Sequence, residues 1–146
     1  MTAKKIEHID YLPEVRPTPR FHKALLIDDS ETDLFINETI LKSLKFSKEI
    51  STQSNPEKAL NFLRSVEKLS EIPDVIFLDL NMPGMDGFEF LAGFNSLPEF
   101  IKNKCKIIVL TSSRNKEDKH KAMMNKSVIR YIMKPLDAYH LRDFIG

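Results

Sequence analysis

The chain has 146 residues, of which 42% are hydrophobic and 29% charged, a composition that predicts one globular domain with a buried core. Its 22 Lys and Arg nearly balance 21 Asp and Glu, so the formal charge of +1 favours neither nucleic acid nor a membrane as a partner. The single cysteine, Cys105, excludes an intramolecular disulfide, and no Cys/His cluster has metal-ligand spacing.

Residues 1–22 differ in composition from the rest of the chain and are predicted to form an N-terminal tail. They hold three of the eight prolines, Pro13, Pro17 and Pro19, each of which fixes its own φ and disfavours helix in the preceding residue. The tail lacks the apolar segment of a signal peptide, and no run approaches the ~20 apolar residues of a membrane span. We therefore expect a cytoplasmic protein whose functional domain is residues 23–146.

Within this domain, short apolar runs alternate with amphipathic segments. After Ser30, for example, apolar residues recur at the spacings of three and four that are typical of a helix. In chain order the predicted elements are a strand at 24–27, a helix from Ser30, a weaker strand at 49–52, a helix from 54–57, a strand at 75–78, a helix at 88–94, a strand at 107–110, a helix at 116–124, a strand at 129–133 and a helix at 137–145. This alternation predicts an α/β fold, a doubly wound five-stranded parallel sheet with helices on both faces.

The second of these helices has two possible starts. Either Ser54 and Glu57 form a capping box, or Asn55 caps the helix with Pro56 at its first position.

Polar side chains follow the strongest predicted strands at their carboxyl ends. In an open parallel sheet the ligand site lies outside these ends, where the strand order reverses. We therefore expect five side chains to converge at one edge of the sheet, those of Asp28, Asp29, Asp79, Thr111 and Lys134.

The residue types in this group indicate phosphate chemistry at a metal ion. Three carboxylates held close together repel one another unless a cation lies among them. Mg²⁺ prefers oxygen ligands and is usually held by one or two carboxylates plus phosphate oxygens. Lys134 supplies a further positive charge, and Thr111 supplies a hydroxyl donor for a phosphoryl oxygen.

The motifs around these residues resemble those of the receiver domains of two-component response regulators, from Lys23 to Phe144. The matching motifs are LLIDD at 25–29, IFLDLNMPGMDGFEFL at 76–91, VLTSS at 109–113 and YIMKP at 131–135. The resemblance implies the flavodoxin-like strand order 2-1-3-4-5. It also implies a phosphoacceptor switch rather than an enzyme, with at most self-phosphorylation from small donors and autodephosphorylation.

The resemblance also assigns a role to each residue around the metal. Asp79 would be the phosphoacceptor, and Asp29 and Asp79 would coordinate Mg²⁺ directly. Asp28 would help mainly through water, and Asn81 would offer its backbone carbonyl. The implied phosphoryl donor is a sensor histidine kinase or a histidine phosphotransfer protein.

The remaining roles concern the switch itself. Thr111 would be the switch hydroxyl, and Lys134 would pair with the phosphoryl group. The Lys134–Pro135 peptide would be cis, and Tyr131 stands where the family keeps its rotating aromatic residue. The surface that changes would bind a downstream protein partner, which the sequence does not identify.

The chain departs from the family pattern in two places. Many receivers have Gly-Ala before the last strand, where this chain has Lys-Ser-Val at 126–128, so we expect an unusual turn there. The last helix, 137–145, has at most about nine residues, which is short for a helix that packs on a sheet. Both a stand-alone receiver, similar to chemotaxis regulators, and a receiver followed by an output domain beyond Gly146 fit this pattern.

Particular residues disfavour three alternatives to an active receiver domain. A phosphatase of the haloacid dehalogenase type also uses Asp, Mg²⁺, Thr/Ser and Lys, but it has Asp-x-Asp at its first strand and its acidic pair last. In this chain the acidic pair comes first, and Asp79 is followed by Leu80 and Asn81 instead of completing an Asp-x-Asp motif. A flavodoxin-like protein cradles the flavin phosphate after the first strand, where Asp28 and Asp29 would repel it. A degenerate receiver would have lost the acceptor, the lysine or the acids, all of which are present.

Overall fold

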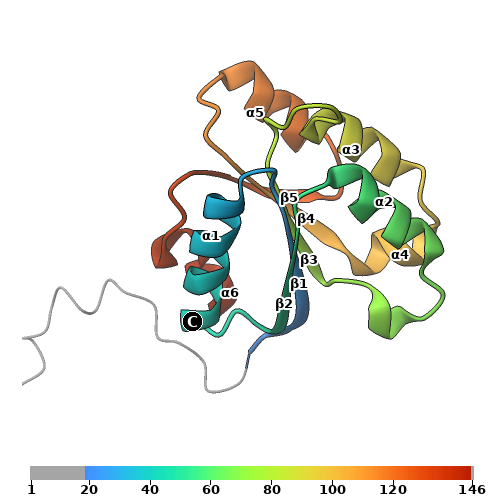
Figure 1. Ribbon diagram of the computed structural model, residues 1–146, viewed down its shortest axis with the longest axis horizontal. Coiled ribbons are helices and arrows are strands. Elements are labelled where there is room, and N and C mark those ends of the chain that lie inside the picture. The colour runs from blue at the N-terminus through green and yellow to red at the C-terminus, as the bar shows by residue number, and fades with distance from the viewer. Residues whose placement is uncertain (1–18, 146) are drawn as a thin grey trace, which may run out of the picture.

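The computed structural model describes residues 19–145, in which five strands form a single parallel sheet (Figure 1). The strands are β1 (Phe21–Ile27), β2 (Ser47–Gln53), β3 (Val75–Leu78), β4 (Lys106–Thr111) and β5 (Val128–Met133). Their order is β2-β1-β3-β4-β5, and every neighbouring pair is parallel. The predicted α/β fold and its flavodoxin-like strand order are confirmed.

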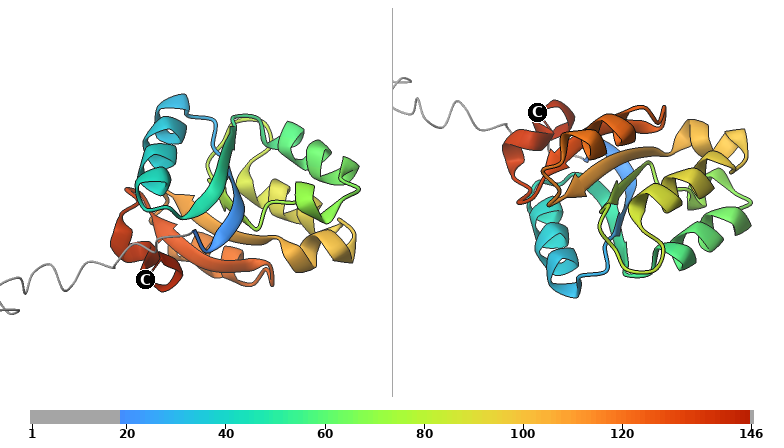
Figure 2. Two further views of the ribbon diagram at one scale, coloured as in Figure 1. Left: turned by 90° about the horizontal axis from the view of Figure 1, so that it is seen from below. Right: turned by 90° about the horizontal axis from the view of Figure 1, so that it is seen from above.

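Helices cover both faces of the sheet. They are α1 (Glu31–Ser43), α2 (Pro56–Ser65), α3 (Gly87–Asn95), α4 (Glu99–Lys104), α5 (Lys116–Met123) and α6 (Arg142–Ile145), with short 3-10 turns η2 (Leu69–Glu71) and η3 (Ala138–Leu141). Figures 1 and 2 show α1 and α6 on one face and α2 to α5 on the other. Within residues 19–145, no helix is both long and apolar enough to span a membrane.

The sheet separates two hydrophobic cores because successive side chains of a strand point to opposite faces. In β1, Leu25 and Ile27 belong to the core under α2 and α3, whereas Ala24 and Leu26 belong to the core under α1 and α6. All four residues of β3 are buried, and this explains its uninterrupted apolar sequence. The edge strand β2 is largely exposed, so its sequence signal is weak.

Side-chain caps begin four of the α-helices, namely α1, α2, α3 and α5. The Ser30 side chain accepts a hydrogen bond from the amide of Asp33 at the start of α1. Asn55 caps α2 by accepting from the amide of Lys58, with Pro56 at the first helical position, so of the two starts that the sequence allowed, this one is found.

The structure differs from the predicted elements at three places. β1 begins at Phe21, inside the predicted tail, because Phe21 pairs with Ser47 and its ring lies 5.0 Å from that of Phe46. The five predicted helices did not include α4, which follows Pro98 and buries Ile101. The predicted last helix is divided into η3 and α6. Residues 1–18 of the predicted tail and Gly146 lie outside the described residues.

The turn before β5 contains the Lys-Ser-Val segment that departs from the family pattern, and it is held by Asn125. Asn125 accepts a hydrogen bond from the amide of Ser127, and its own carbonyl accepts from the amide of Val128. The pairing of β4 with β5 then shifts register between Ile107 and Ile108. This irregularity lies at the end of β5 that is remote from Lys134, so the carboxyl ends of the strands remain aligned.

Candidate functional site

The pairing of β1 with β3 brings the three predicted acidic residues together. Ile27 and Leu78 are partners in the sheet, so the residues that follow them, Asp28 and Asp79, emerge side by side. The amide of Asp79 also donates to the carbonyl of Ile27 at 3.0 Å. Asp28, Asp29 and Asp79 each offer a carboxylate oxygen, and these oxygens lie within 4.8 Å of one another.

Lys134 joins this acidic cluster from the end of β5. Its ammonium lies 2.7 Å from Oδ2 of Asp28, 2.7 Å from Oδ2 of Asp33 and 3.6 Å from Oδ2 of Asp79. Burial by itself would lower the pKa of Lys134, but the hydrogen bonds to Asp28 and Asp33 outweigh it, and the pKa is raised. Lys134 therefore carries a full positive charge in the cluster at neutral pH. Its peptide bond with Pro135 is cis, as the resemblance implied.

The carboxyl group of Asp79 is buried, with 5% of the residue exposed. Burial is the largest influence on its pKa and raises it; Lys134 acts in the opposite direction, and the negative charge of Asp28 raises it further, so the net shift is upward. Oδ1 of Asp79 accepts a hydrogen bond from the amide of Asn81 at 3.3 Å. Among the residues between 19 and 145, the carboxylate of Asp79 thus has the negative charge of Asp28 and the positive charge of Lys134 as its charged neighbours.

Thr111 and Asn81 lie beside the acidic cluster and contact each other. Thr111 is fully buried at the end of β4, and its hydroxyl accepts from the side-chain amide of Asn81 at 3.5 Å and from the amide of Ser113 at 3.3 Å. The side chain of Asn81 therefore contacts the predicted switch residue. The backbone carbonyl of Asn81 as a metal ligand stays a prediction.

Tyr131 lies in β5, and its hydroxyl donates to the carbonyl of Ser113 at 3.4 Å. Ser113 follows Thr111 by two residues, and its hydroxyl bonds to Asp118 of α5 at 2.7 Å. A path of direct hydrogen bonds thus connects the site to both β5 and the helix that packs beside it.

A glycine brings helix α3 against the segment that follows β3. The amide of Gly87 donates to the carbonyl of Leu80 at 3.0 Å. A Cβ atom at Gly87 would lie 2.6 Å from the carbonyl oxygen of Asp79 and 2.6 Å from Cα of Leu80, so only glycine fits this approach.

The sequence did not identify Asp33 as a member of the site. Asp33 is the third residue of α1, four residues after Asp29, which is about one turn of a helix. A helix that begins at the carboxyl edge of the sheet directs its first turn toward the ligand site, so an acidic residue four positions after the Asp pair was the available signal.

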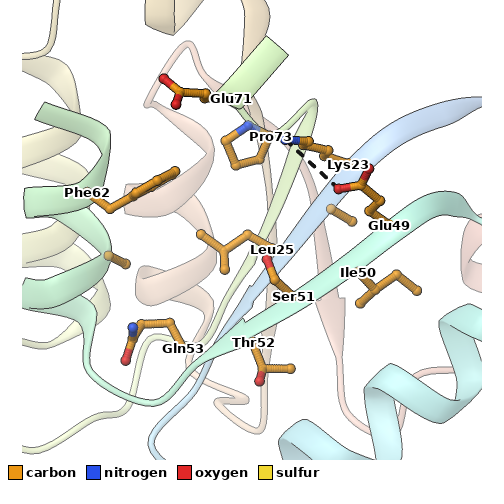
Figure 3. Close-up of a pocket in the computed structure, with 12 residues that line it drawn as sticks. Lys23, Leu25, Glu49, Ile50, Ser51, Thr52, Gln53, Phe62, Glu71 and Pro73 are labelled. Carbon is orange, nitrogen blue, oxygen red and sulfur yellow. Dashed lines mark ion pairs between the residues drawn. The ribbon is translucent and has the colours of Figure 1, made fainter. Parts of the chain in front are cut away.

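The structure also contains a cavity of about 340 Å³ away from the acidic cluster, between β2 and α2 (Figure 3). Leu25 and Phe62 give it an apolar wall, and the ion pair of Lys23 with Glu49, at 3.9 Å, lies at its end. None of the clustered acidic residues lines it. A hollow beside the cluster itself is lined by Asp29 together with residues of the 54–57 and 83–85 segments, and it leaves Asp29 open to solvent.

Comparison with known proteins adds two relatives in sequence. The chain is 32% identical over 128 residues to the sensor histidine kinase CheAY of Helicobacter pylori, an alignment that covers 88% of this chain and 15% of that protein. It is 32% identical over 96 residues to the response regulator Rcp1 of Synechocystis sp., with 64% of each chain covered. The chain thus spans only part of the length of both relatives.

Solved structures agree with these sequence relatives. A two component response regulator from Cytophaga hutchinsonii has a TM-score of 0.78 at 32% identity, with 85% of this chain and 93% of that chain covered. The Mn²⁺-bound form of Rcp1 has a TM-score of 0.66 at 28% identity, with 84% and 87% covered. Residues 24–146 match the response regulator receiver domain, and the chain belongs to that family.

Proposed function

We propose that Asp79 accepts one phosphoryl group from a sensor histidine kinase or a histidine phosphotransfer protein, and that the modified domain then binds a downstream protein. The observation that carries this proposal is the acidic cluster of Asp28, Asp29 and Asp79 beside Lys134. Membership of the receiver family supports the role of phosphoacceptor. Cytoplasmic location, where such donors act on soluble partners, belongs to the same proposal.

The residues present fit a bound Mg²⁺ ion. Asp28, Asp29 and Asp79 supply hard oxygen ligands within 4.8 Å of one another, and Lys134 offsets only part of their negative charge. Asp29 and Asp79 would hold the ion directly, Asp28 mainly through water, and Asn81 through its carbonyl. The Mn²⁺-bound form of the relative Rcp1 supports a divalent ion in this fold. When bound, Mg²⁺ lowers the repulsion between the carboxylates and an incoming phosphoryl group.

The proposed transfer needs no general base. A carboxylate oxygen of Asp79 bonds to the phosphorus while the bond from phosphorus to the histidine nitrogen breaks, and the electron pair leaves with the imidazole. Lys134 and Thr111 lie where they can bind the oxygens of the transferred group. The product is an acyl phosphate, which water cleaves to restore Asp79 and release phosphate, so the signal is limited in time.

The proposed switch uses the hydrogen bonds that leave the site. Thr111 and Lys134 move toward the phosphoryl group, and Tyr131 turns inward as its contact with Ser113 changes. The surface made by α5, β5 and the segment of η3 and α6 then changes shape. This surface would bind the downstream protein partner.

Intact-mass analysis tests the acceptor. The full chain is incubated with acetyl phosphate, with and without Mg²⁺, and one added phosphoryl group is expected only with the metal. Asp79→Asn should remain unmodified, whereas the matched control Asp86→Asn, on the same loop and still able to cap α3, should be modified like wild type. Equal labelling of Asp79→Asn and wild type, or steady turnover of small phosphomonoesters, would contradict the proposal.

A further inference from the structure

The ammonium group of Lys134 makes its short contacts with the two acids that flank the acceptor and not with the acceptor itself. It lies 2.7 Å from both Asp28 and Asp33, but 3.6 Å from Asp79. An ammonium group has three hydrogen-bond donors, and two of them are directed to these short contacts. The third donor allows one further bond, so a second bond from Lys134 to a phosphoryl group on Asp79 requires it to give up or lengthen one of these two contacts.

The two carboxylates that Lys134 contacts at 2.7 Å differ in the cost of losing the ammonium group. The Asp28 side chain is 7% exposed, so without the ammonium it would remain a buried carboxylate with little access to water. The Asp33 side chain is 37% exposed, so water can replace the ammonium there at small cost. Asp33 is therefore the partner that Lys134 exchanges more readily.

We propose that Asp33 is a positioning residue that competes with the phosphoryl group on Asp79 for Lys134. In the unmodified protein Asp33 and Asp28 hold the ammonium beside the acceptor. After phosphorylation, Lys134 replaces its bond to Asp33 with one to a phosphoryl oxygen, and Asp33 turns to solvent. This proposal rests on the proposed role of Asp79 as the acceptor.

If Asp33 competes for Lys134, its substitution should change the affinity for a phosphoryl group in the opposite direction from the change expected if Asp33 only supports the site. Loss of an acidic residue that only supports the site would weaken the binding of a phosphoryl group. Loss of a competitor frees a donor of Lys134 and removes a negative charge that repels the anion, so binding becomes tighter. A gain in affinity is therefore the diagnostic result.

The first turn of α1 offers a matched control. Glu31 and Asp33 both lie in this turn, where a carboxylate interacts favourably with the helix dipole. Glu31 is exposed and forms no ion pair with any residue between 19 and 145. Glu31→Gln thus removes the same charge from the same turn without touching Lys134. Asp33→Glu keeps the charge and serves as the conservative variant.

The experiment titrates the full chain with beryllofluoride at saturating Mg²⁺, with binding followed by ¹⁹F NMR. Because a pair of this exposure contributes modestly, we expect Asp33→Asn to bind about three- to fivefold more tightly than wild type. Glu31→Gln should bind like wild type, and Asp33→Glu should bind more weakly than Asp33→Asn. The ¹⁵N resonance of the Lys134 ammonium should shift on adding beryllofluoride in wild type and, before any addition, should already differ in Asp33→Asn.

The outcomes separate this inference from the proposed function. If wild type binds beryllofluoride no better than Asp79→Asn, the proposed function fails. If wild type binds but Asp33→Asn binds equally or more weakly, the competition is overturned while the acceptor role stands. A gain in Glu31→Gln as large as in Asp33→Asn would assign the effect to overall charge and also overturn the competition.

Discussion

Asp79 is buried among carboxylates, with Lys134 3.6 Å from its Oδ2 atom. This environment fits the proposed role of Asp79, in which it accepts an anionic phosphoryl group only when a metal cation is present. Without the cation, the same environment disfavours the ionised carboxylate. The charges of the cluster therefore affect the free energy of unfolding, and this effect depends on pH.

Removal of the Asp79 charge should stabilise the protein without Mg²⁺. The pKa of Asp79 is raised above its ordinary value of 3.8, so the folded state binds this proton more tightly than the unfolded chain does. The free energy of unfolding contributed by this group is greatest at low pH and is lost as the pH rises from the unfolded value through the raised pKa. Asp79→Asn should consequently unfold at a higher temperature than wild type at pH 7 in chelator, and the difference should diminish in acid.

Asp29 provides the corresponding test of the metal site. Because Asp29 contributes one of three adjacent carboxylates, Asp29→Ala should weaken Mg²⁺ binding by about tenfold or more and reduce phosphorylation with it. Without Mg²⁺ the variant should be no less stable than wild type, since one repulsive charge is removed. Calorimetric titration with Mg²⁺ measures the affinity. Glu57→Gln, which removes a charge from the same hollow, is the control, and an unchanged affinity in Asp29→Ala would refute the assignment as a ligand.

At the scale of the element, the beginnings of helices hold the site in place. Ser30 caps α1 directly after Asp28 and Asp29, and the amide that it caps is that of Asp33. One cap thus directs both the proposed metal-binding pair and the further partner of Lys134 toward the same edge of the sheet. In the same way, the glycine at position 87 lets α3 begin against the segment that follows β3.

The cap of α2 can be tested by substitution. Asn55 accepts from the amide of Lys58 at 3.1 Å, so Asn55→Ala should lower the free energy of unfolding by about 1 kcal/mol. Ser54→Ala should change it little, because Ser54 lies before the cap. Urea denaturation of the two variants and wild type gives these values, and a larger loss in Ser54→Ala would contradict the observed cap.

At the scale of the whole molecule, the available interactions limit how the proposed switch can work. Moving a two-state equilibrium from 1:99 to 99:1 takes about 5.5 kcal/mol, whereas one hydrogen bond to a charged group contributes roughly 1.5 to 3 kcal/mol. Thr111 alone therefore cannot complete the switch. The contact with Lys134, or a partner that prefers the active state, must supply the remainder.

This limit predicts the extent of the response in Thr111→Ala. Beryllofluoride should change the NMR shifts of wild type from Thr111 through Tyr131 to α5, along the hydrogen bonds by way of Ser113. Thr111→Ala should still bind the mimic but show reduced changes at Tyr131 and α5, and Thr111→Ser should restore them. Changes confined to the loop after Asp79, or a full response in Thr111→Ala, would show that the proposed path is wrong.

Sequence by itself determined the fold and the main residues of the site. Apolar runs such as 75–78 and 107–110 are local signals of buried strands, and an acid or hydroxyl directly after each run is equally local. Once the strands are parallel, their carboxyl ends share one edge, so the convergence of Asp79 and Thr111 follows without knowledge of the packing.

Tertiary structure decided the features that depend on relations between elements. The contact of Asp33 with Lys134 joins residues 101 positions apart, and it requires both the direction of the first turn of α1 and the position of the end of β5. Helix α4 is stabilised by the burial of Ile101 against the rest of the fold. Its six residues are too few to show an apolar pattern, so the sequence did not predict this helix. The choice of Asn55 over Ser54 as the cap likewise depends on where the chain leaves β2. Local sequence patterns encode which side chains are buried. The distances between charged groups, and therefore the ion pairs that form, depend on how the elements pack against one another.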